Sequence, residues 1–204
     1  METGEGGLRE RKKRATRRAL SEAVIRLSLE HGFDNVTVED IASAANVSER
    51  TFRNYFANKA EAVVAMHVER GRQIADVLRE RPADEPLWDA LVNAVIEQFE
   101  HQPAPEQPAD DRHTSARQRL LAEPAVQHEV FRAHATAQRE LTEAIAARTG
   151  TDATADLYPQ VVASVVGAGL NTAITHWTRD PERSLVPLLR EIFAQIRAGL
   201  PDPR

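Results

Sequence analysis

The 204-residue sequence predicts an all-α protein of about nine helices, with a short N-terminal three-helix unit followed by a larger C-terminal helical domain. Three observations predict it. Apolar residues recur at helical spacing along most of the chain, capping residues precede several of these runs, and prolines fall between helices or in their first turns. With 42% apolar and 28% charged residues, the composition is that of an ordinary globular protein.

The composition excludes several classes of protein. Cysteine is absent, so the chain has no disulfide framework, thiolate metal site or cysteine nucleophile, which fits a reducing cytoplasm. The start METGEGGLRERKKR lacks an apolar signal-peptide core, and we expect no run approaching the roughly 18 apolar residues of a membrane span. We therefore expect a cytoplasmic protein without a membrane partner, a metal or a cofactor.

Charge is distributed unevenly along the chain. The formal net charge of −5 combines +2 over residues 1–60 with −7 over residues 61–204. Between Leu8 and Arg18, seven basic residues accompany one acid. A basic arm on an acidic body indicates a polyanion partner at one end, although a solvated tail that only aids solubility is the alternative.

Stop and start signals divide the first 60 residues into three helices. A helix is predicted over 14–31, and Gly32 ends it in the left-handed αL conformation. Thr37 caps a second helix of about two turns, with Asp40 as a capping-box acid, and Asn46 ends it at positive φ. Ser48 caps a third. A long helix followed by two short ones joined by a tight turn is typical of a helix-turn-helix unit.

The third helix has two different faces. At 100° per residue, Phe52 and Phe56 share one face and should be buried. The opposite face carries side chains that suit base edges in the major groove: Arg50, Arg53 and Asn54, with Thr51 beside them. A plain solvated face is the alternative.

Lys59 falls in the first turn of the next helix, where the helix dipole disfavours a cation by about 0.3–1 kcal/mol. Asn58 is the predicted N-cap of that helix and Glu61 the return half of a capping box. The position is explained if a DNA phosphate is the neighbour, shared with the helix N-terminus and the Tyr55 hydroxyl. In the alternative, Lys59 points to solvent and Glu61 offsets its charge.

The stretch GFDNVTVEDIASAANVSERTFRNYFANKAEAV (32–63) closely resembles the DNA-binding domain of the tetracycline-repressor (TetR) family of bacterial transcriptional regulators. The resemblance covers about the first 65 residues. It implies phosphate contacts from five residues and base contacts from three, the first set being Thr37, Ser48, Thr51, Tyr55 and Lys59, and the second Arg50, Arg53 and Asn54.

Glu49 and Arg50 replace a frequent Lys-Gly pair of the family, which puts the base preference in question. Glu49 could accept a hydrogen bond from cytosine or pair with Arg53 one turn later; we favour the pairing in the free protein. Asn46 replaces a frequent glycine, a change that αL geometry tolerates.

The remaining chain predicts further helices over 58–80, 86–101, 110–122, 124–148 and 157–178, with a proline-rich loop at 102–109. We divide the chain into a DNA-binding domain, residues 1–60, and a ligand-binding and dimerisation domain, residues 61–204. Asp156 is the expected cap of the 157–178 helix, which is nearly uncharged, and Ser184 that of a final helix.

The last two helices carry surplus apolar surface, which predicts a symmetric four-helix dimer interface. Four residues of the final helix form the expected seam: Leu185, Leu189, Ile192 and Ile196. Burial of the same residues within one subunit is the alternative. A twofold dimer would place two recognition helices about 34–36 Å apart on a palindromic operator.

The resemblance also implies a small-molecule effector. The middle helices and one polar residue of the uncharged helix supply candidate ligand contacts, each of which could equally be plain core: Trp88, Leu91, Val95, Phe99, Leu120, Phe131 and Asn171. The segment RQRLLAEPAV (117–126) resembles the C-terminal domain of a TetR subgroup that senses acyl-CoA-like ligands. A phosphate-bearing ligand would then need Arg117, Arg119 or Arg132 near the pocket mouth.

Other functions fit the sequence less well. The histidines of HEVFRAH (128–134) are six residues apart and do not form H-E-x-x-H, and the sequence holds no phosphate-binding glycine loop or nucleophile elbow, so we expect no enzyme. A non-specific DNA-architectural protein would need only the basic arm. We favour a homodimeric repressor whose ligand moves the 58–80 helix and releases the DNA operator.

Overall fold

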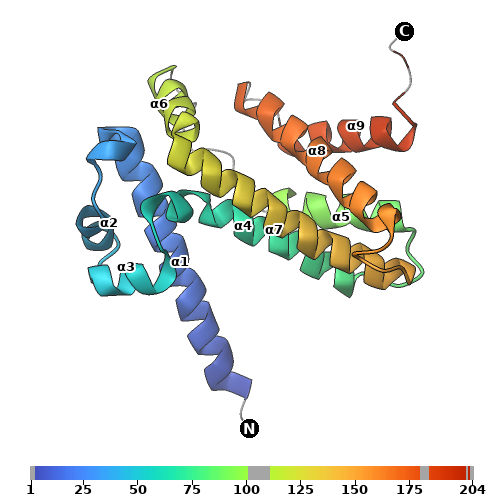
Figure 1. Ribbon diagram of the computed structural model, residues 1–204, viewed down its shortest axis with the longest axis horizontal. Coiled ribbons are helices and arrows are strands. Elements are labelled where there is room, and N and C mark those ends of the chain that lie inside the picture. The colour runs from blue at the N-terminus through green and yellow to red at the C-terminus, as the bar shows by residue number, and fades with distance from the viewer. Residues whose placement is uncertain (1–2, 101–110, 180–183, 201, 203–204) are drawn as a thin grey trace. The chain divides into compact units, whose positions relative to one another are not determined.

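The computed structural model describes residues 3–100, 111–179, 184–200 and 202 (Figure 1). These residues form nine α-helices and one short 3-10 helix, with no strand among them, which confirms the all-α prediction. The predicted loop at 102–109 lies outside them. The helices are α1 Thr3–His31, η1 Phe33–Asn35, α2 Val38–Ala44, α3 Glu49–Tyr55, α4 Lys59–Glu80, α5 Leu87–Glu100, α6 Asp111–Ala122, α7 Pro124–Thr149, α8 Leu157–Arg179 and α9 Leu185–Arg197.

Helix α1 begins at Thr3, well before the predicted start at residue 14. The added residues include the basic stretch, which is therefore helical. Arginine and lysine are good helix formers, and this preference needs no apolar face. The sequence expectation relied on apolar periodicity, which is absent from this segment, and so placed the start too late.

Two tight turns separate the first three helices. Gly32 follows α1 at φ 85° and ψ 145°, so it has the expected positive φ but lies outside the αL region that was predicted. Only glycine tolerates that conformation readily. Asn46, between α2 and α3, has φ 53° as predicted.

Both short helices are capped by their own side chains. The Thr37 hydroxyl accepts the Asp40 N–H, and the Asp40 carboxylate accepts the Thr37 N–H at 2.9 Å, so the predicted capping box is complete. Hydrogen bonds from the Thr37 hydroxyl and N–H to this carboxylate lower the pKa of Asp40. Ser48 caps α3 by accepting the Thr51 N–H at 3.2 Å.

The chain forms two compact units, and the division between them runs through α4 and α7. The first contains residues 1–68 and 110–133, and the second residues 69–109 and 134–204. The helix-turn-helix segment therefore packs with α6 and the start of α7, which the sequence division had assigned to the other domain.

An apolar cluster holds the first unit together. Helix α1 contacts α2, η1 and α6, and α2 contacts α3 (Figure 1). The side chains buried most completely in this cluster come from five helices: Leu20, Val24, Ile41, Phe52, Phe56, Ala62 and Val126. Because Phe52 of α3 and the residue that directly follows the helix, Phe56, both pack in this core, the orientation of α3 is fixed by packing.

The second unit is built on α5, α8 and α9, with parts of α4 and α7. Helix α9 contacts both α5 and α8. Two glycines allow close helix crossings here. A Cβ atom on Gly71 of α4 would lie 2.5 Å from the Cβ of Ala137 in α7, and one on Gly169 of α8 would lie 3.0 Å from both Phe193 and Ile196 of α9. A larger residue at either glycine would therefore separate the helices.

Helix α8 is apolar and yet widely exposed in the single chain. Its segment Leu157–Trp177 has mean hydropathy 1.2 and passes the length and composition test for a membrane span, although the sequence analysis expected no such run. Only 28% of the segment is buried. Its exposed residues include three large ones at its start and a stripe of small ones: Leu157, Tyr158 and Val161, then Ser164, Gly167, Ala168, Asn171, Thr172 and Thr175.

Both predicted caps at α8 and α9 occupy the expected positions without acting as side-chain caps. Asp156 precedes α8, but its carboxylate accepts the Asp152 N–H at 2.8 Å. Ser184 precedes α9 and makes no side-chain capping hydrogen bond.

Lys59, the first residue of α4, contacts the turn after α1. Its Nζ donates to the carbonyl oxygens of Phe33 at 2.5 Å and Val36 at 3.0 Å, and it lies 4.3 Å from the centroid of the Phe33 ring. The alternative in which Lys59 points to solvent is therefore wrong. Hydrogen bonds from a charged donor contribute about 1.5–3 kcal/mol each, which exceeds the dipole cost of about 0.3–1 kcal/mol.

Replacing Lys59 with Met should lower the free energy of unfolding by about 2 kcal/mol, because two carbonyls lose a charged donor while the aliphatic stem is kept. Urea unfolding followed by circular dichroism measures the change. Lys13→Met, at an exposed position of α1, is the control and should change stability by less than about 0.5 kcal/mol. Equal stabilities for the Lys59 variant and wild type would show that the bridge to Phe33 and Val36 contributes nothing.

Candidate nucleic-acid interface

Helix α3 presents a polar face on an apolar base, as the sequence predicts. Phe52 and Phe56 are each 1% exposed, and their ring centroids are 5.7 Å apart. Arg50, Arg53 and Asn54 are exposed. Packing of the two rings in the core thus holds three hydrogen-bonding side chains outward, and these are the types that can bond to guanine and adenine edges.

Glu49 and Arg53 pair along α3. Arg53 Nη2 lies 3.0 Å from Glu49 Oε2, and both side chains are exposed. This is the pairing favoured from the sequence for the free protein. Since exposed pairs of this spacing are weak, at about 0.3–0.5 kcal/mol, Arg53 can leave Glu49 for a stronger acceptor.

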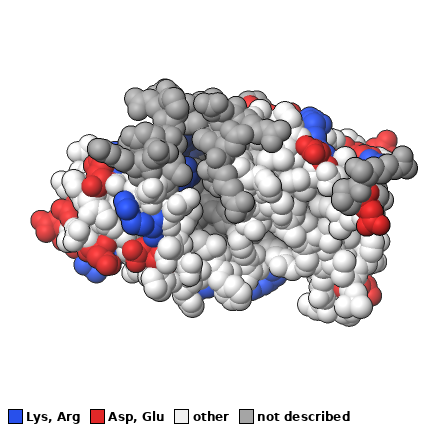
Figure 2. Space-filling view, turned by 90° about the horizontal axis from the view of Figure 1, so that it is seen from above, with Lys and Arg blue, Asp and Glu red and all other residues white. Residues whose placement is uncertain are grey.

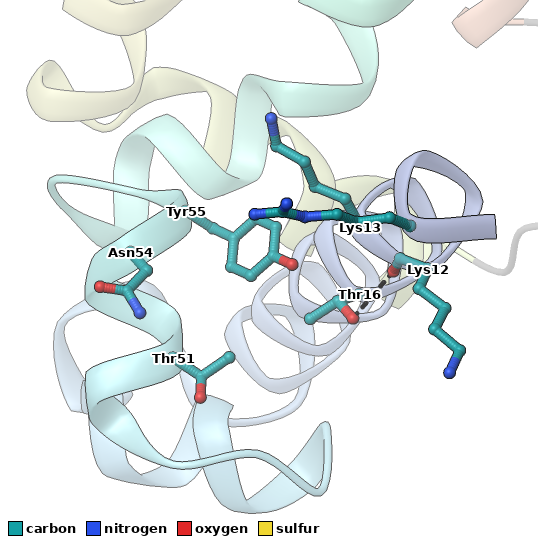
Figure 3. Close-up of a pocket in the computed structure, with 7 residues that line it drawn as sticks. Lys12, Lys13, Thr16, Thr51, Asn54 and Tyr55 are labelled. Atoms are coloured by element: carbon teal, nitrogen blue, oxygen red, sulfur yellow. Dashed lines mark hydrogen bonds between the residues drawn. The ribbon is translucent and has the colours of Figure 1, made fainter. Parts of the chain in front are cut away.

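A basic hollow lies between the first turns of α1 and one side of α3 (Figure 3). Its volume is about 790 Å³, and its lining combines cationic, hydroxyl and amide groups: Arg9, Lys12, Lys13, Thr16, Thr51, Asn54 and Tyr55. The Thr16 hydroxyl donates to the Lys12 carbonyl at 3.0 Å. Ammonium, guanidinium and hydroxyl donors around one hollow can hold an anion such as a phosphate.

The basic residues of α1 differ in whether they already have partners. Arg18 is paired with Glu22 at 2.7 Å, and the Arg17 guanidinium lies 4.7 Å from the centroid of the Phe56 ring. Within the described part of the chain, Lys12 and Lys13 have no acidic partner, and both are exposed. Lys12 and Lys13 are thus unpaired cations that line the hollow, together with Arg9.

The described surface on the face shown in Figure 2 carries no comparable basic area. Lysines and arginines are scattered there among acidic side chains, and a wide part of the described surface has neither charge. The concentration of positive charge on α1 therefore distinguishes the hollow from this face.

The residues expected to contact phosphate are largely engaged within the protein. The Thr37 and Ser48 hydroxyls cap helices, and Ser48 Oγ is also 2.9 Å from Thr51 Oγ1. Lys59 uses two of its three donors on carbonyl groups. Tyr55 and Thr51 line the hollow. The phosphate assignments stay predictions, with Thr51 and Tyr55 nearest to the unpaired cations.

Sequence reasoning did not include four lining residues of the hollow, Arg9, Lys12, Lys13 and Thr16, among the site residues. The basic stretch had indicated a polyanion partner. The sequence analysis began the first helix at residue 14 and so did not place Lys12 on it. In the structure the helix includes both residues, and Lys12 and Thr16 lie one turn apart on the same side.

The start of α4 is connected to α7 by polar contacts. Asn58 Oδ1 accepts the Glu61 N–H at 2.8 Å, so Asn58 caps α4 as predicted. The Glu61 carboxylate accepts the Ala57 N–H at 2.7 Å rather than the Asn58 N–H, so the predicted capping box is replaced by a bond one residue earlier. Asn58 Nδ2 also donates to Glu129 Oε1 at 3.3 Å. Glu129 is only 7% exposed and pairs with Arg132 at 3.4 Å.

The seven candidate ligand residues are distributed over the two compact units. Leu91, Val95 and Phe99 are buried in the core of the second unit, and Trp88 packs against Phe193 with ring centroids 6.0 Å apart. Leu120 belongs to the core of the first unit. These residues thus belong to the cores of two separate units, and their assignment to one ligand site stays a prediction.

Two of these candidates are corrected individually. Phe131 is 73% exposed, and Asn171 is also exposed, so neither lines an interior cavity of the chain. An aromatic residue or asparagine within an apolar helix can face either side, and the sequence pattern did not decide which. Among the described residues, no group of three or more histidine or acidic side chains could hold a metal ion.

The four residues of the predicted dimer seam differ in their exposure. Leu189 is fully buried and Leu185 is 9% exposed, both in the core of their own chain, so these two residues are corrected. Ile192 and Ile196 are partly exposed beside α8 and stay predictions. The apolar seam of α9 thus serves mainly internal packing, the alternative considered from the sequence.

Solved structures with a similar fold are bacterial regulators. The fatty acid degradation regulator FadR from Bacillus halodurans has a TM-score of 0.56 at 19% identity, covering 92% of this chain and 97% of that one. FadR from Bacillus subtilis in complex with stearoyl-CoA has a TM-score of 0.56 at 17% identity, covering 89% and 97%. At these identities the likeness shows the fold alone.

Sequence comparison shows to which proteins this chain is related. Two curated relatives match along most of their length. One is a Mycobacterium tuberculosis (strain ATCC 25618 / H37Rv) protein that carries the name mycofactocin biosynthesis transcriptional regulator MftR, 30% identical over 193 residues and 93% of each chain. The other is the HTH-type transcriptional regulator TcmR of Streptomyces glaucescens, 31% identical over 173 residues, 84% of this chain and 76% of that one.

Two family descriptions match separate parts of the sequence. Residues 20–66 match "Bacterial regulatory proteins, tetR family", and residues 85–201 match "MftR C-terminal domain". The first match contains the capped helices and the polar face of α3, and the second covers more than half of the chain. The resemblance seen from residues 32–63 is thereby confirmed: this chain belongs to the TetR family of bacterial transcriptional regulators.

Proposed function

We propose that this TetR-family regulator is a homodimeric repressor that binds a palindromic DNA operator and is released by a small, largely apolar ligand. The observation that carries the proposal is the exposed Arg50, Arg53 and Asn54 face of α3, held outward by two buried phenylalanines. Such side chains bond bidentately to guanine or adenine in the major groove.

The hollow beside this face would supply contacts to the DNA backbone. A phosphate group there would meet the ammonium groups of Lys12 and Lys13 and the hydroxyls of Thr51 and Tyr55. Each cation that neutralises a phosphate releases a condensed counterion, so these contacts would add affinity without sequence preference.

Dimerisation would cover the exposed side of α8. The small residues Ser164, Gly167, Ala168 and Asn171 are exposed in the single chain and would allow close approach of a second copy. Ile192 and Ile196 of α9 lie beside α8 and would extend the same interface. A twofold axis would then present two α3 helices to successive major grooves.

Release would act through α4, which, like α7, belongs to both compact units and begins directly after the helix-turn-helix. The effector candidates of the second unit are Trp88, Leu91, Val95 and Phe99, which adjoin Ile74 and Leu78 of α4 in one core. The similarity to FadR solved with stearoyl-CoA supports an acyl-CoA-like effector. Such a ligand shifts the equilibrium only if it binds the conformation that does not fit DNA more tightly.

Selection of bound sequences from a random DNA pool at near-physiological salt should yield a palindrome with half-sites about 10–10.5 base pairs apart. Arg53→Ala should then relax the preference at one base pair per half-site by about 1–3 kcal/mol, measured with single-base operator variants. Binding that follows salt concentration but no sequence would instead identify a non-specific DNA-architectural protein.

Replacing both Lys12 and Lys13 with Gln should weaken binding to all sequences alike. If each subunit of a dimer loses one phosphate contact, the slope of log K against log salt concentration should fall by about 1.8. The matched control is Arg18→Gln with Arg26→Gln, which removes the same charge from α1 at positions paired with Glu22 and Glu30. An equal fall of this slope in the control would show that DNA affinity depends on the total charge of α1 and not on the cations of the hollow.

Ala168→Glu should convert the dimer to monomers, because an unpaired carboxylate would be buried between two copies of α8. Sedimentation velocity measures the change, and the thermal midpoint of the monomeric variant shows that it is folded. Ala147→Glu, on an exposed position of α7, is the control and should stay dimeric. A dimer that survives Ala168→Glu would place the interface elsewhere.

A further inference from the structure

Arg70 is a partly buried cation in the middle of α4. Its guanidinium lies 4.7 Å from the centroid of the Phe99 ring, and Phe99, on α5, is itself only 6% exposed. Desolvation by burial lowers the pKa of Arg70, although an arginine stays charged at neutral pH. The side chain thus holds a full positive charge against an apolar ring.

Four other arginines of the second unit have acceptors. Arg72 pairs with Glu140 at 3.0 Å, Arg190 with Glu100 at 3.6 Å and Arg197 with Asp89 at 2.6 Å. Arg148 donates to backbone carbonyls, one of them that of Glu85 at 2.7 Å. Within the described residues, Arg70 has neither a carboxylate nor a carbonyl acceptor. Arg70 is therefore partly buried and has no anionic partner among the described residues.

A guanidinium in this state is unfavourable for the isolated chain. The guanidinium has five N–H donors, and burial removes part of the water that would hydrate them. The contact with the Phe99 ring compensates for only part of this lost hydration. A carboxylate or phosphate would restore the missing bonds in the bidentate geometry that arginine favours. Such an anion would lie beside Phe99, a residue already proposed to contact the effector.

We infer that Arg70 binds an anionic group of the effector, so that the ligand is an amphipathic anion with its apolar part against α5 near Phe99. This inference rests on the proposed function and specifies its ligand. It differs from the sequence expectation that Arg117, Arg119 or Arg132 near the pocket mouth would supply the charge, which stays a prediction. Arg117 and Arg119 are exposed, and Arg132 pairs with Glu129 in the first unit.

Because Arg70 lies on α4, anion binding there would act on a helix that begins in the DNA-binding unit. Arg70 and Lys59 belong to the same helix, about 16 Å apart along its axis at 1.5 Å per residue. Lys59 holds the turn after α1. A ligand that pulls on Arg70 therefore acts on the helix that begins at the DNA-binding head, without an intermediate element.

The test is a ¹H–¹⁵N NMR titration of the full-length protein with dodecanoate, dodecyl phosphate and dodecanol, below micelle-forming concentrations. The Arg70 Nε–H resonance is assigned by its loss in Arg70→Lys. We expect the two anions to shift this resonance and dodecanol to leave it unchanged. No shift with either anion, or the same shift with dodecanol, overturns the inference.

Binding affinities give a second readout. Calorimetry should show dodecanoate binding at least tenfold more weakly to Arg70→Gln than to wild type, with dodecanol affinity unaltered. Arg139→Gln, at an exposed position of α7 in the same unit, is the matched control and should behave as wild type. Unchanged dodecanoate binding in Arg70→Gln overturns the inference. Operator binding is measured separately, and its absence in wild type would overturn the proposed function instead.

Discussion

The contact of Lys59 with the turn after α1 is the constraint on which the arrangement of the DNA-binding unit depends. Helix α4 begins with a cation where the helix dipole disfavours one, and the two carbonyl oxygens of Phe33 and Val36 outweigh that cost. Those carbonyls lie immediately before α2. One ammonium group therefore connects the start of α4 to the segment that leads into the helix-turn-helix.

The rest of the interface follows from this connection and from the aromatic core beneath it. With α4 tied to the turn, Phe52 and Phe56 pack among α1 residues such as Leu20 and Val24, and α3 cannot rotate without exposing a ring. Rigid placement matters because hydrogen bonds to base edges require fixed geometry. The polar face of α3 and the cations of α1 can then border one hollow.

Lys59 also shows how far sequence reasoning reaches. The capping pattern around Asn58 correctly located the start of α4. The dipole argument predicted a DNA phosphate beside Lys59, and that assignment stays a prediction. The acceptors turned out to include backbone carbonyls some 25 residues earlier, which no local pattern specifies. Local capping and helical faces were predictable because they depend on neighbours within one turn.

Failures of the sequence analysis share one physical cause. Leu189 and Ile192 have the same periodicity on α9, but only tertiary packing decides that Leu189 is fully buried while Ile192 is partly exposed. Phe131 similarly lies on the exposed side of α7 although its type suggested a pocket. Arg70 was not a candidate at all, because an arginine in a polar stretch of helix gives no sign of being withdrawn from water.

In the mechanism that we propose, Lys59 and Arg70 would together connect anion binding to the DNA-binding unit through α4. Both cations contact a phenylalanine ring, one in each compact unit, and both belong to one continuous helix. Lys59 already has its acceptors, whereas Arg70 would gain one only when an anion binds. If that anion favours the conformation that does not fit DNA, linkage requires the operator to weaken anion binding by the same factor. The affinity of the free protein for an amphipathic anion would therefore always exceed that of the DNA-bound protein.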